Sequence, residues 1–157
     1  MMLLYDYLDT PIGILEIACD ENYIYGISFT DQRKKPSSSL LSKQAKHELK
    51  EYFEGRRTAF SLPLRLDGTP FQKEVWKALY EIPYARTCSY KDIAVKIGRP
   101  GAARAVGQAC NKNPIAIVIP CHRVIGSSKK LVGYAGGPEK KLYLLNLEQN
   151  LLKLSGQ

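Results

Sequence analysis

One stretch constrains this chain more than any other, the ten residues 115–124. Five apolar residues run into Pro120, and the tetrapeptide Cys-His-Arg-Val follows without a spacer. The apolar run favours a strand or an extended core segment, and the proline removes a backbone donor where the polar groups begin. A thiol beside a histidine and a fixed positive charge is in a setting that lowers a thiol pKa. We therefore interpret Cys121 as a candidate nucleophile.

The composition is that of a globular protein, because 45% of the 157 residues are hydrophobic and 24% are charged. This length suits one sizeable domain or two small ones. The first residues lack a basic region followed by a long apolar core, so a secretory signal is not expected. No stretch approaches the length of a membrane span. The sequence predicts a cytoplasmic protein without a membrane partner.

The formal net charge of +8 is distributed unevenly along the chain. Residues 1–67 carry nine Lys/Arg and ten Asp/Glu, whereas residues 68–157 carry fourteen and five. A basic half is expected where a protein meets a polyanion such as DNA. A basic surface that serves solubility explains the same numbers, and the charge alone leaves both interpretations open.

The cysteines do not show the spacing of a metal site, since no CxxC pair occurs and the chain has two histidines. Without a secretory signal, a disulfide framework is not expected either. We therefore predict no metal and no cofactor. Cys19 and Cys88 are interpreted as small buried hydrophobes. Cys110 is either another of these or part of a pocket near Cys121.

The first half predicts a small α+β domain. Residues rich in Tyr, Ile and Leu, separated by turn sequences, indicate an antiparallel meander of strands at 2–8, 13–19 and 23–29. Apolar residues at helical spacing predict a helix over 40–53, and 60–66 is a further extended segment. A linker at 66–68 divides the chain into an N-terminal domain, 1–67, and a second domain, 68–157.

The second half predicts mostly helices in a winged-helix-like arrangement, so the fold class is α+β. Thr69-Pro70-Phe71-Gln72 has the pattern of a capped helix start. Ser89 caps a helix that stops at Gly98, and a second helix runs from 102 to 110, which together describe a helix-turn-helix. The second helix carries one arginine among small residues, namely Arg104 among Ala102, Ala103, Ala105 and Gly107. Such a helix suits close approach to a narrow groove, or tight packing against a neighbour.

A last helix begins at Pro138, and its buried face is marked by leucines at 144, 145, 151 and 152. Glu148 falls in the middle of this apolar stripe and needs a partner, because burying an unpaired charge is costly. We expect that partner to be His122. A hydrogen bond from Glu148 would orient the imidazole and let it draw a proton from Cys121.

The segment Pro-Cys-His-Arg-Val at 120–124 is similar to the signature of the O6-alkylguanine-DNA alkyltransferases, also called methylated-DNA–protein-cysteine methyltransferases. The resemblance extends from Phe71 to Glu148. It implies repair of double-stranded DNA by irreversible transfer of an alkyl group from guanine O6 to Cys121, once per molecule. Activity on O4-alkylthymine is left open, and a monomer is expected.

The resemblance also assigns roles at the acceptor site. Cys121 would attack the alkyl carbon, and His122, through a water, and Glu148 would generate its thiolate. Asn113 matches a hinge asparagine that ties the helix-turn-helix to the active-site loop. Tyr90 matches a tyrosine that crowds the target phosphate and helps to protonate the leaving guanine at N3.

On the DNA side, Arg104 matches an arginine finger that replaces the flipped base, and the small residues match a recognition helix in the minor groove. Arg123 is also assigned to DNA. The guanine pocket is expected to contain Tyr134, Ala135, Val124 and Cys110. Ala135 stands where some members have serine, and the cysteines and histidines that bind zinc in some members are not visible here.

Two rival functions explain less of the sequence. A non-catalytic helix-turn-helix module would leave Cys121 and the buried Glu148 unexplained. A cysteine hydrolase using Cys121, His122 and Glu148 would place nucleophile and base next to each other in the chain, an awkward arrangement for direct contact. It would also give the basic half no role.

Overall fold

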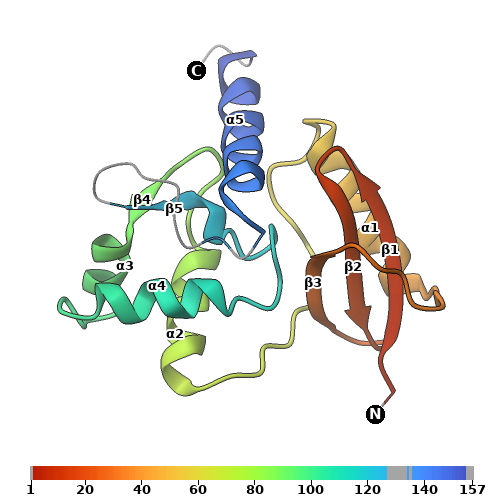
Figure 1. Cartoon of the computed structure of the whole chain (residues 1–157), viewed down its shortest axis with the longest axis horizontal. Helices are drawn as coiled ribbons and strands as arrows, with labels where there is room; N and C mark the ends of the chain where they lie inside the picture. The colour runs from red at the N-terminus through yellow and green to blue at the C-terminus, as the bar shows by residue number, and fades with distance from the viewer. Residues whose placement is uncertain (1, 127–133, 135, 155–157) are drawn as a thin grey trace. The chain divides into compact units, whose positions relative to one another are not determined.

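The computed structural model describes residues 2–126, 134 and 136–154, with the backbone alone for 151–154. The chain forms two compact units. The first contains Met1–Asp67 together with Pro114–Ala116, and the second contains Gly68–Asn113 and Ile117–Gln157. Figure 1 shows a sheet with one helix in the first unit and mostly helices in the second. The predicted α+β class is confirmed.

The first unit is built on an antiparallel sheet with the strand order β1-β2-β3. The strands are β1 (Leu4–Thr10), β2 (Gly13–Cys19) and β3 (Ile24–Thr30). Asp20 closes the second turn by accepting hydrogen bonds from the backbone of Asn22 and Tyr23 at 2.7 and 2.8 Å. Alternate residues of β2 are fully buried, so one face of the sheet forms the core. The predicted meander is therefore present.

Helix α1 (Leu40–Phe53) covers the sheet, as Figure 1 shows. It begins at a capping box in which Ser39 and Ser42 each accept a hydrogen bond from the other's backbone. Residues at helical spacing are buried against β1 and β2, namely Leu41, Ala45, Leu49 and Tyr52. The helical spacing of apolar residues in the sequence predicted this helix with the same bounds, 40–53.

Two extended segments pair with β3. The backbone of Ile24 bonds to Pro63 and Arg65 at 2.8 and 2.9 Å, and the backbone of Ile27 bonds to residues 114 and 116 at 3.0 and 2.8 Å. The apolar run after residue 114 is therefore extended at its start, but it does not continue as a strand. It turns at Ile117, which adopts a left-handed conformation with φ 73°. A β-branched residue rarely accepts this conformation, and here it redirects the chain toward Cys121.

The second unit contains a helix-turn-helix and a long final helix. Its described helices are α2 (Pro70–Tyr80), α3 (Tyr90–Lys96), α4 (Ala103–Asn111), the short 3-10 helix η1 (Cys121–Arg123) and α5 (Pro138–Leu154). Two short strands, β4 (Cys88–Ser89) and β5 (Val124–Ile125), pair in parallel. The predicted caps at Thr69 and Ser89 are both present. Trp76 lies in the core and donates to the carbonyl of Ala109 at 2.9 Å.

Among the described residues, no helix is both long enough and apolar enough to span a membrane.

Candidate active site

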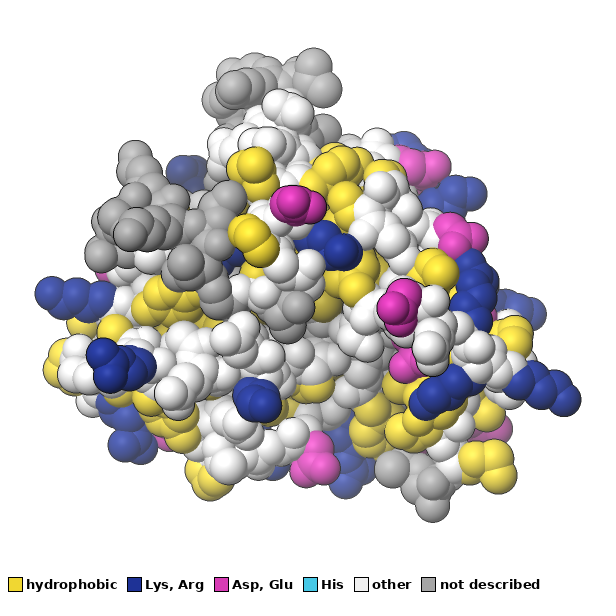
Figure 2. All heavy atoms as spheres, viewed as in Figure 1, with side chains coloured by type: hydrophobic (Ala, Val, Ile, Leu, Met, Phe, Trp, Pro, Cys, Tyr) yellow, Lys and Arg dark blue, Asp and Glu magenta, His cyan; other side chains and the backbone are white. Residues whose placement is uncertain are grey.

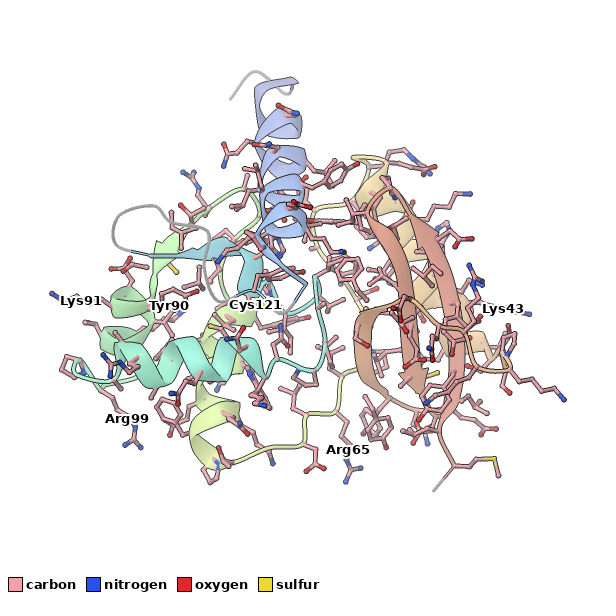
Figure 3. The ribbon with its side chains drawn as sticks, in the orientation of Figure 1. Lys43, Arg65, Tyr90, Lys91, Arg99 and Cys121 are labelled. Atoms are coloured by element: carbon pink, nitrogen blue, oxygen red, sulfur yellow. The ribbon has the colours of Figure 1, made fainter. Side chains whose placement is uncertain are left out.

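Cys121 lies at the start of η1, in the interior of the second unit (Figure 3). Cys121 is 5% exposed. Its backbone N–H donates to the carbonyl of Ile119 at 2.8 Å. The turn at residue 117 and the proline at residue 120 therefore fix the position of the buried thiol.

Asn113 fastens this segment to the end of α4. Its side-chain nitrogen Nδ2 donates to the carbonyl of Ile119 at 2.8 Å and to Sγ of Cys121 at 3.2 Å. The first bond fixes the backbone before the thiol. The second gives a negative sulfur a hydrogen-bond donor, and donation to the charged form of a group favours that form.

The carboxylate of Glu148 accepts hydrogen bonds from three residues of the second unit. Its carboxylate accepts from Nε2 of His122 at 2.7 Å, from Nε and Nη2 of Arg123 at 2.9 and 3.0 Å, and from the backbone N–H of Ala85 at 3.0 Å. Burial acts to raise the pKa of Glu148, but the bonds with His122 and Arg123 lower it to about 2. The carboxylate is therefore ionised, and the predicted contact with His122 is present.

The ionised carboxylate fixes the tautomer of His122. Because Glu148 can only accept, Nε2 carries the proton, and Nδ1 is left with a lone pair. Nδ1 is buried and has no hydrogen-bond partner among the residues that the structure describes. Burial lowers the pKa of His122 in spite of the opposing effect of Glu148. The imidazole is consequently neutral at pH 7 and can accept a proton at Nδ1.

Arg123 does not reach the protein surface. Besides Glu148, it binds the carbonyl of Ile82 through Nη1 at 2.7 Å, and its guanidinium lies 5.5 Å from the centre of the Tyr84 ring. The residue is 6% exposed. The prediction that Arg123 contacts DNA is therefore wrong, because its donors are already used to hold the carboxylate.

The loop after α2 is a part of the site that the sequence did not predict. Ala85 adopts a left-handed conformation with φ 62° and so turns its N–H toward Glu148. Gln149 donates in return to the carbonyl of Ala85 at 2.8 Å. The loop and α5 are thereby bonded in both directions, which fixes the position of the carboxylate.

The pKa of Cys121 is raised, not lowered. Burial is the largest influence, and it outweighs the hydrogen bond from Asn113 and the charge of Lys141, both of which lower the pKa. The lowered pKa expected for this thiol is therefore not found. Ionisation of Cys121 needs a base and hydrogen-bond donors that offset the burial.

Lys141 is a second feature near the thiol that the sequence did not predict. It is 0% exposed, although lysine is almost never fully buried. A signal was available, because residue 141 precedes Glu148 by seven positions and thus lies on the same helical face.

Other residues assigned to the guanine pocket are also buried near the thiol. Tyr134, Cys110 and Val124 are at most 9% exposed. Burial, with a smaller effect of Cys121, raises the pKa of Tyr134, and the same influences raise that of Cys110 to about 12. Tyr90 is half-buried with a pKa of about 12, raised by burial and then by Cys110 and Cys121. Ala135 and the side chains of residues 151 and 152 lie outside the described residues.

Helix α4 has two different faces. Val106, Ala109 and Cys110 point into the core, whereas Arg104 is exposed. The predicted small residues are all partly exposed, namely Ala102, Ala103, Ala105 and Gly107. At Gly107 a β-carbon would lie 3.8 Å from the ring of Tyr90, an ordinary van der Waals contact, so this ring lies beside α4.

Lys and Arg side chains project from the second unit around α3 and α4 in Figure 2. Figure 3 shows Lys91 and Arg99 pointing outward, whereas Tyr90 lies toward Cys121. The exposed side of the helix-turn-helix is therefore basic. Within the described ranges, no group of three or more His, Cys, Asp or Glu residues is placed to hold a metal ion.

Two family models cover most of the chain. Residues 3–66 match the ribonuclease-like domain of 6-O-methylguanine DNA methyltransferase, and residues 70–150 match its DNA binding domain. The chain belongs to the 6-O-methylguanine DNA methyltransferase family.

Relatives in this family resemble the chain over nearly its whole length. The methylated-DNA–protein-cysteine methyltransferase of Methanosarcina barkeri is 49% identical over 95% of this chain and 99% of its own. The O6-methylguanine methyltransferase of Mycobacterium tuberculosis shares 46% identity and a TM-score of 0.88, covering 95% and 94%. A structure of the M. tuberculosis protein in complex with DNA gives a TM-score of 0.87 at 46% identity, covering 94% of this chain and 93% of that chain.

Proposed function

We propose that this protein repairs DNA by moving the alkyl group of O6-alkylguanine onto Sγ of its own Cys121. The observation that carries this proposal is the buried series formed by Cys121, Asn113, His122 and Glu148. It provides a thiol, a donor to the thiolate and a base held in one tautomer. Membership of the methyltransferase family supports the same reaction.

The reaction follows from the protonation states of these groups. Nδ1 of the neutral His122 accepts the thiol proton through a water molecule, and Glu148 stabilises the resulting imidazolium. The sulfur then forms a bond to the alkyl carbon while the bond from that carbon to O6 breaks. The electron pair of the broken bond stays on the guanine, which takes up a proton that balances the one lost by the thiol.

Tyr90 is the group that we propose to protonate the leaving guanine. Its raised pKa of about 12 keeps the phenol protonated at neutral pH, so it can act as a donor. A guanine that gains a proton leaves as a neutral base, whereas the bare anion is a poorer leaving group. The thioether product has no route back to a thiol, so each molecule reacts once.

We propose that α4 approaches DNA with its small residues in the minor groove. An alkyl group on O6 lies within the duplex, and the base must be flipped out to reach a thiol as buried as Cys121. Arg104 projects from the exposed face of α4 and would fill the vacated place in the stack. We further propose a cytoplasmic monomer with a supporting domain at 1–67 and the reacting domain at 68–157.

Transfer of a labelled methyl group tests the function. Incubation with duplex DNA carrying methyl-labelled O6-methylguanine should place one equivalent of label on the protein, and Cys121→Ala should abolish this transfer. Cys88→Ala is the matched control, because it removes a thiol outside the proposed site and should leave the transfer intact.

The same experiment separates the rival functions. Release of label to solvent with repeated turnover would indicate a hydrolase. Binding of the damaged duplex without any transfer by the wild type would indicate a non-catalytic DNA-binding module. Either result would contradict the proposal.

A further inference from the structure

Ala85 binds the final helix through both of its backbone groups. Its N–H donates to Oε1 of Glu148 at 3.0 Å, and its carbonyl accepts from Nε2 of Gln149 at 2.8 Å. Neighbouring residues of a helix point about 100° apart around its axis. The side chains of Glu148 and Gln149 therefore bind residue 85 from two directions.

The backbone of Ala85 is in a conformation that alanine rarely adopts. Its φ of 62° lies in the left-handed region, which is unfavourable for any residue that has a β-carbon. A residue stays in this region only where the surrounding structure fixes it, and such residues are concentrated at functional sites. Ala85 is buried, and its bonds with α5 help to hold it there.

The two oxygens of the Glu148 carboxylate have different partners. Oε1 accepts from Ala85 and from Nε of Arg123, whereas Oε2 accepts from Nε2 of His122 and from Nη2 of Arg123. A rotation of the carboxylate that weakens the bond with Ala85 also moves Oε2 relative to the imidazole. The orientation of the oxygen that binds His122 therefore depends on the backbone of residue 85.

The turn at residues 82–85 also holds the cation that neutralises Glu148. Nη1 of Arg123 donates to the carbonyl of Ile82 at 2.7 Å. The first end of this turn is bonded to α2, because the N–H of Ile82 donates to the carbonyl of Leu79 at 3.0 Å. At the other end, the bond from Gln149 to Ala85 fastens the turn to α5.

We propose that Gln149 is a positioning residue for alkyl transfer, because it holds the turn at Ala85 that fixes the orientation of Glu148. This inference rests on the proposed function. Gln149 acts through Ala85 and the carboxylate, and it takes no part in the transfer of the proton or the alkyl group. Its effect on the reaction is to keep His122 in the orientation and tautomer of a base.

Removal of one hydrogen bond tests the proposal. Gln149→Met keeps the length and the helix propensity of the side chain but lacks the amide donor. Single-turnover rates would be measured with free O6-benzylguanine, which removes DNA binding from the measurement. The loss of one neutral hydrogen bond corresponds to a factor of about three to ten, and transfer should be slower by this factor.

Two further variants give the rate its meaning. Gln149→Lys restores a donor of similar reach and should recover most of the rate. Asn146→Met removes an exposed amide of the same helix and should match the wild type. Thermal unfolding would establish that each variant is folded, and Gln149→Leu would replace the methionine variant if that one is not.

A double-mutant cycle separates positioning from packing. If Gln149 acts through the carboxylate, Gln149→Met should change the rate by less than about twofold when Glu148 is already replaced by glutamine. An equal loss in both backgrounds would mean that Gln149 acts through the packing of α5, and this would overturn the proposal. A wild-type rate in the folded methionine variant would overturn it as well.

The hydrogen bond of His122 gives a readout that does not require activity. The chain has two histidines, and the side chain of His47 is 68% exposed, so the Nε2 proton of the buried His122 can be identified by NMR after labelling histidine with ¹⁵N. Gln149→Met should shift this resonance or speed its exchange with water, and Asn146→Met should do neither. An unchanged resonance in Gln149→Met would contradict the positioning role.

This spectrum also separates the inference from the proposed function. If the wild type takes no alkyl group from benzylguanine or from methylated DNA, the proposed function fails. The resonance of His122 then decides by itself whether Gln149 positions the imidazole.

Discussion

Glu148 remains ionised inside an apolar stripe because the fold surrounds it with donors. His122, Arg123 and the backbone of Ala85 all bind its carboxylate. These bonds do two things at once. They make the burial of a charge tolerable, and they leave Nδ1 of His122 as the proton acceptor. A single residue thus links the stability of the second unit to its chemistry.

Replacing Glu148 by glutamine should slow methyl transfer at neutral pH by about a hundredfold or more, since the base loses its orienting anion. Single-turnover assays with methylated DNA would measure this. A variant that folds and transfers at the wild-type rate would remove Glu148 from the mechanism.

The same substitution should change the acid stability of the protein. The folded pKa of Glu148, about 2, lies below the ordinary value of 4.5, so its contribution is present above pH 4.5 and is lost as the pH falls toward 2. This difference corresponds to about 3 kcal/mol. Urea unfolding across this range should show a shallower loss of free energy in Glu148→Gln, and parallel curves would contradict the assignment.

At the scale of elements, α4 combines a packed face with an exposed one. Val106 and Ala109 anchor it in the core, and Trp76 binds its backbone through Ala109. The partly exposed face keeps short side chains, so the helix backbone can come close to a groove. The helix ends near Asn113, which bonds to Sγ of Cys121. A displacement of α4 by DNA would therefore change the hydrogen bond between Asn113 and the thiol.

Arg104→Ala should weaken repair of duplex DNA by at least about tenfold, because an inserted side chain offsets the unstacking of the flipped base. Its reaction with free O6-benzylguanine should stay within twofold of the wild-type rate. Single-turnover assays with both substrates would measure the two effects. Equal losses with both would show that the arginine supports the fold of α4 and not the flipped duplex.

At the scale of the whole molecule, the charge is divided along the chain. Residues 68–157 carry the entire positive excess, and the same segment contains the helix-turn-helix and the thiol. A basic surface beside the acceptor site attracts DNA without regard to sequence. Such attraction suits a repair protein that must examine long stretches of undamaged duplex.

The affinity for undamaged duplex should therefore fall with salt. If several phosphates are neutralised, raising the salt from about 50 to 200 mM should weaken binding by about tenfold or more. Fluorescence anisotropy would measure this loss. The reaction with free O6-benzylguanine serves as the control and should be insensitive to the same change. A flat binding curve would refute the proposed role of the basic half.

The sequence by itself determined the elements and much of the site. Helix α1 and the caps at Thr69 and Ser89 are present where periodicity and capping patterns placed them. These signals are readable because they depend on residues within a few positions of one another. The contact between His122 and Glu148 was also predictable, since a carboxylate in a leucine stripe demands a partner.

The tertiary structure alone decided how the charges are arranged. The partners of Arg123 are 25 and 41 residues away in the chain, and their hydrogen bonds hold its side chain in the interior of the second unit. The turn at Ile117 ends an apolar run that resembled a strand. Burial raises the pKa of Cys121, and Lys141 opposes this from α5. Solvation and charge at a site depend on every element packed around it, so a local motif identifies the reacting atom but not its environment.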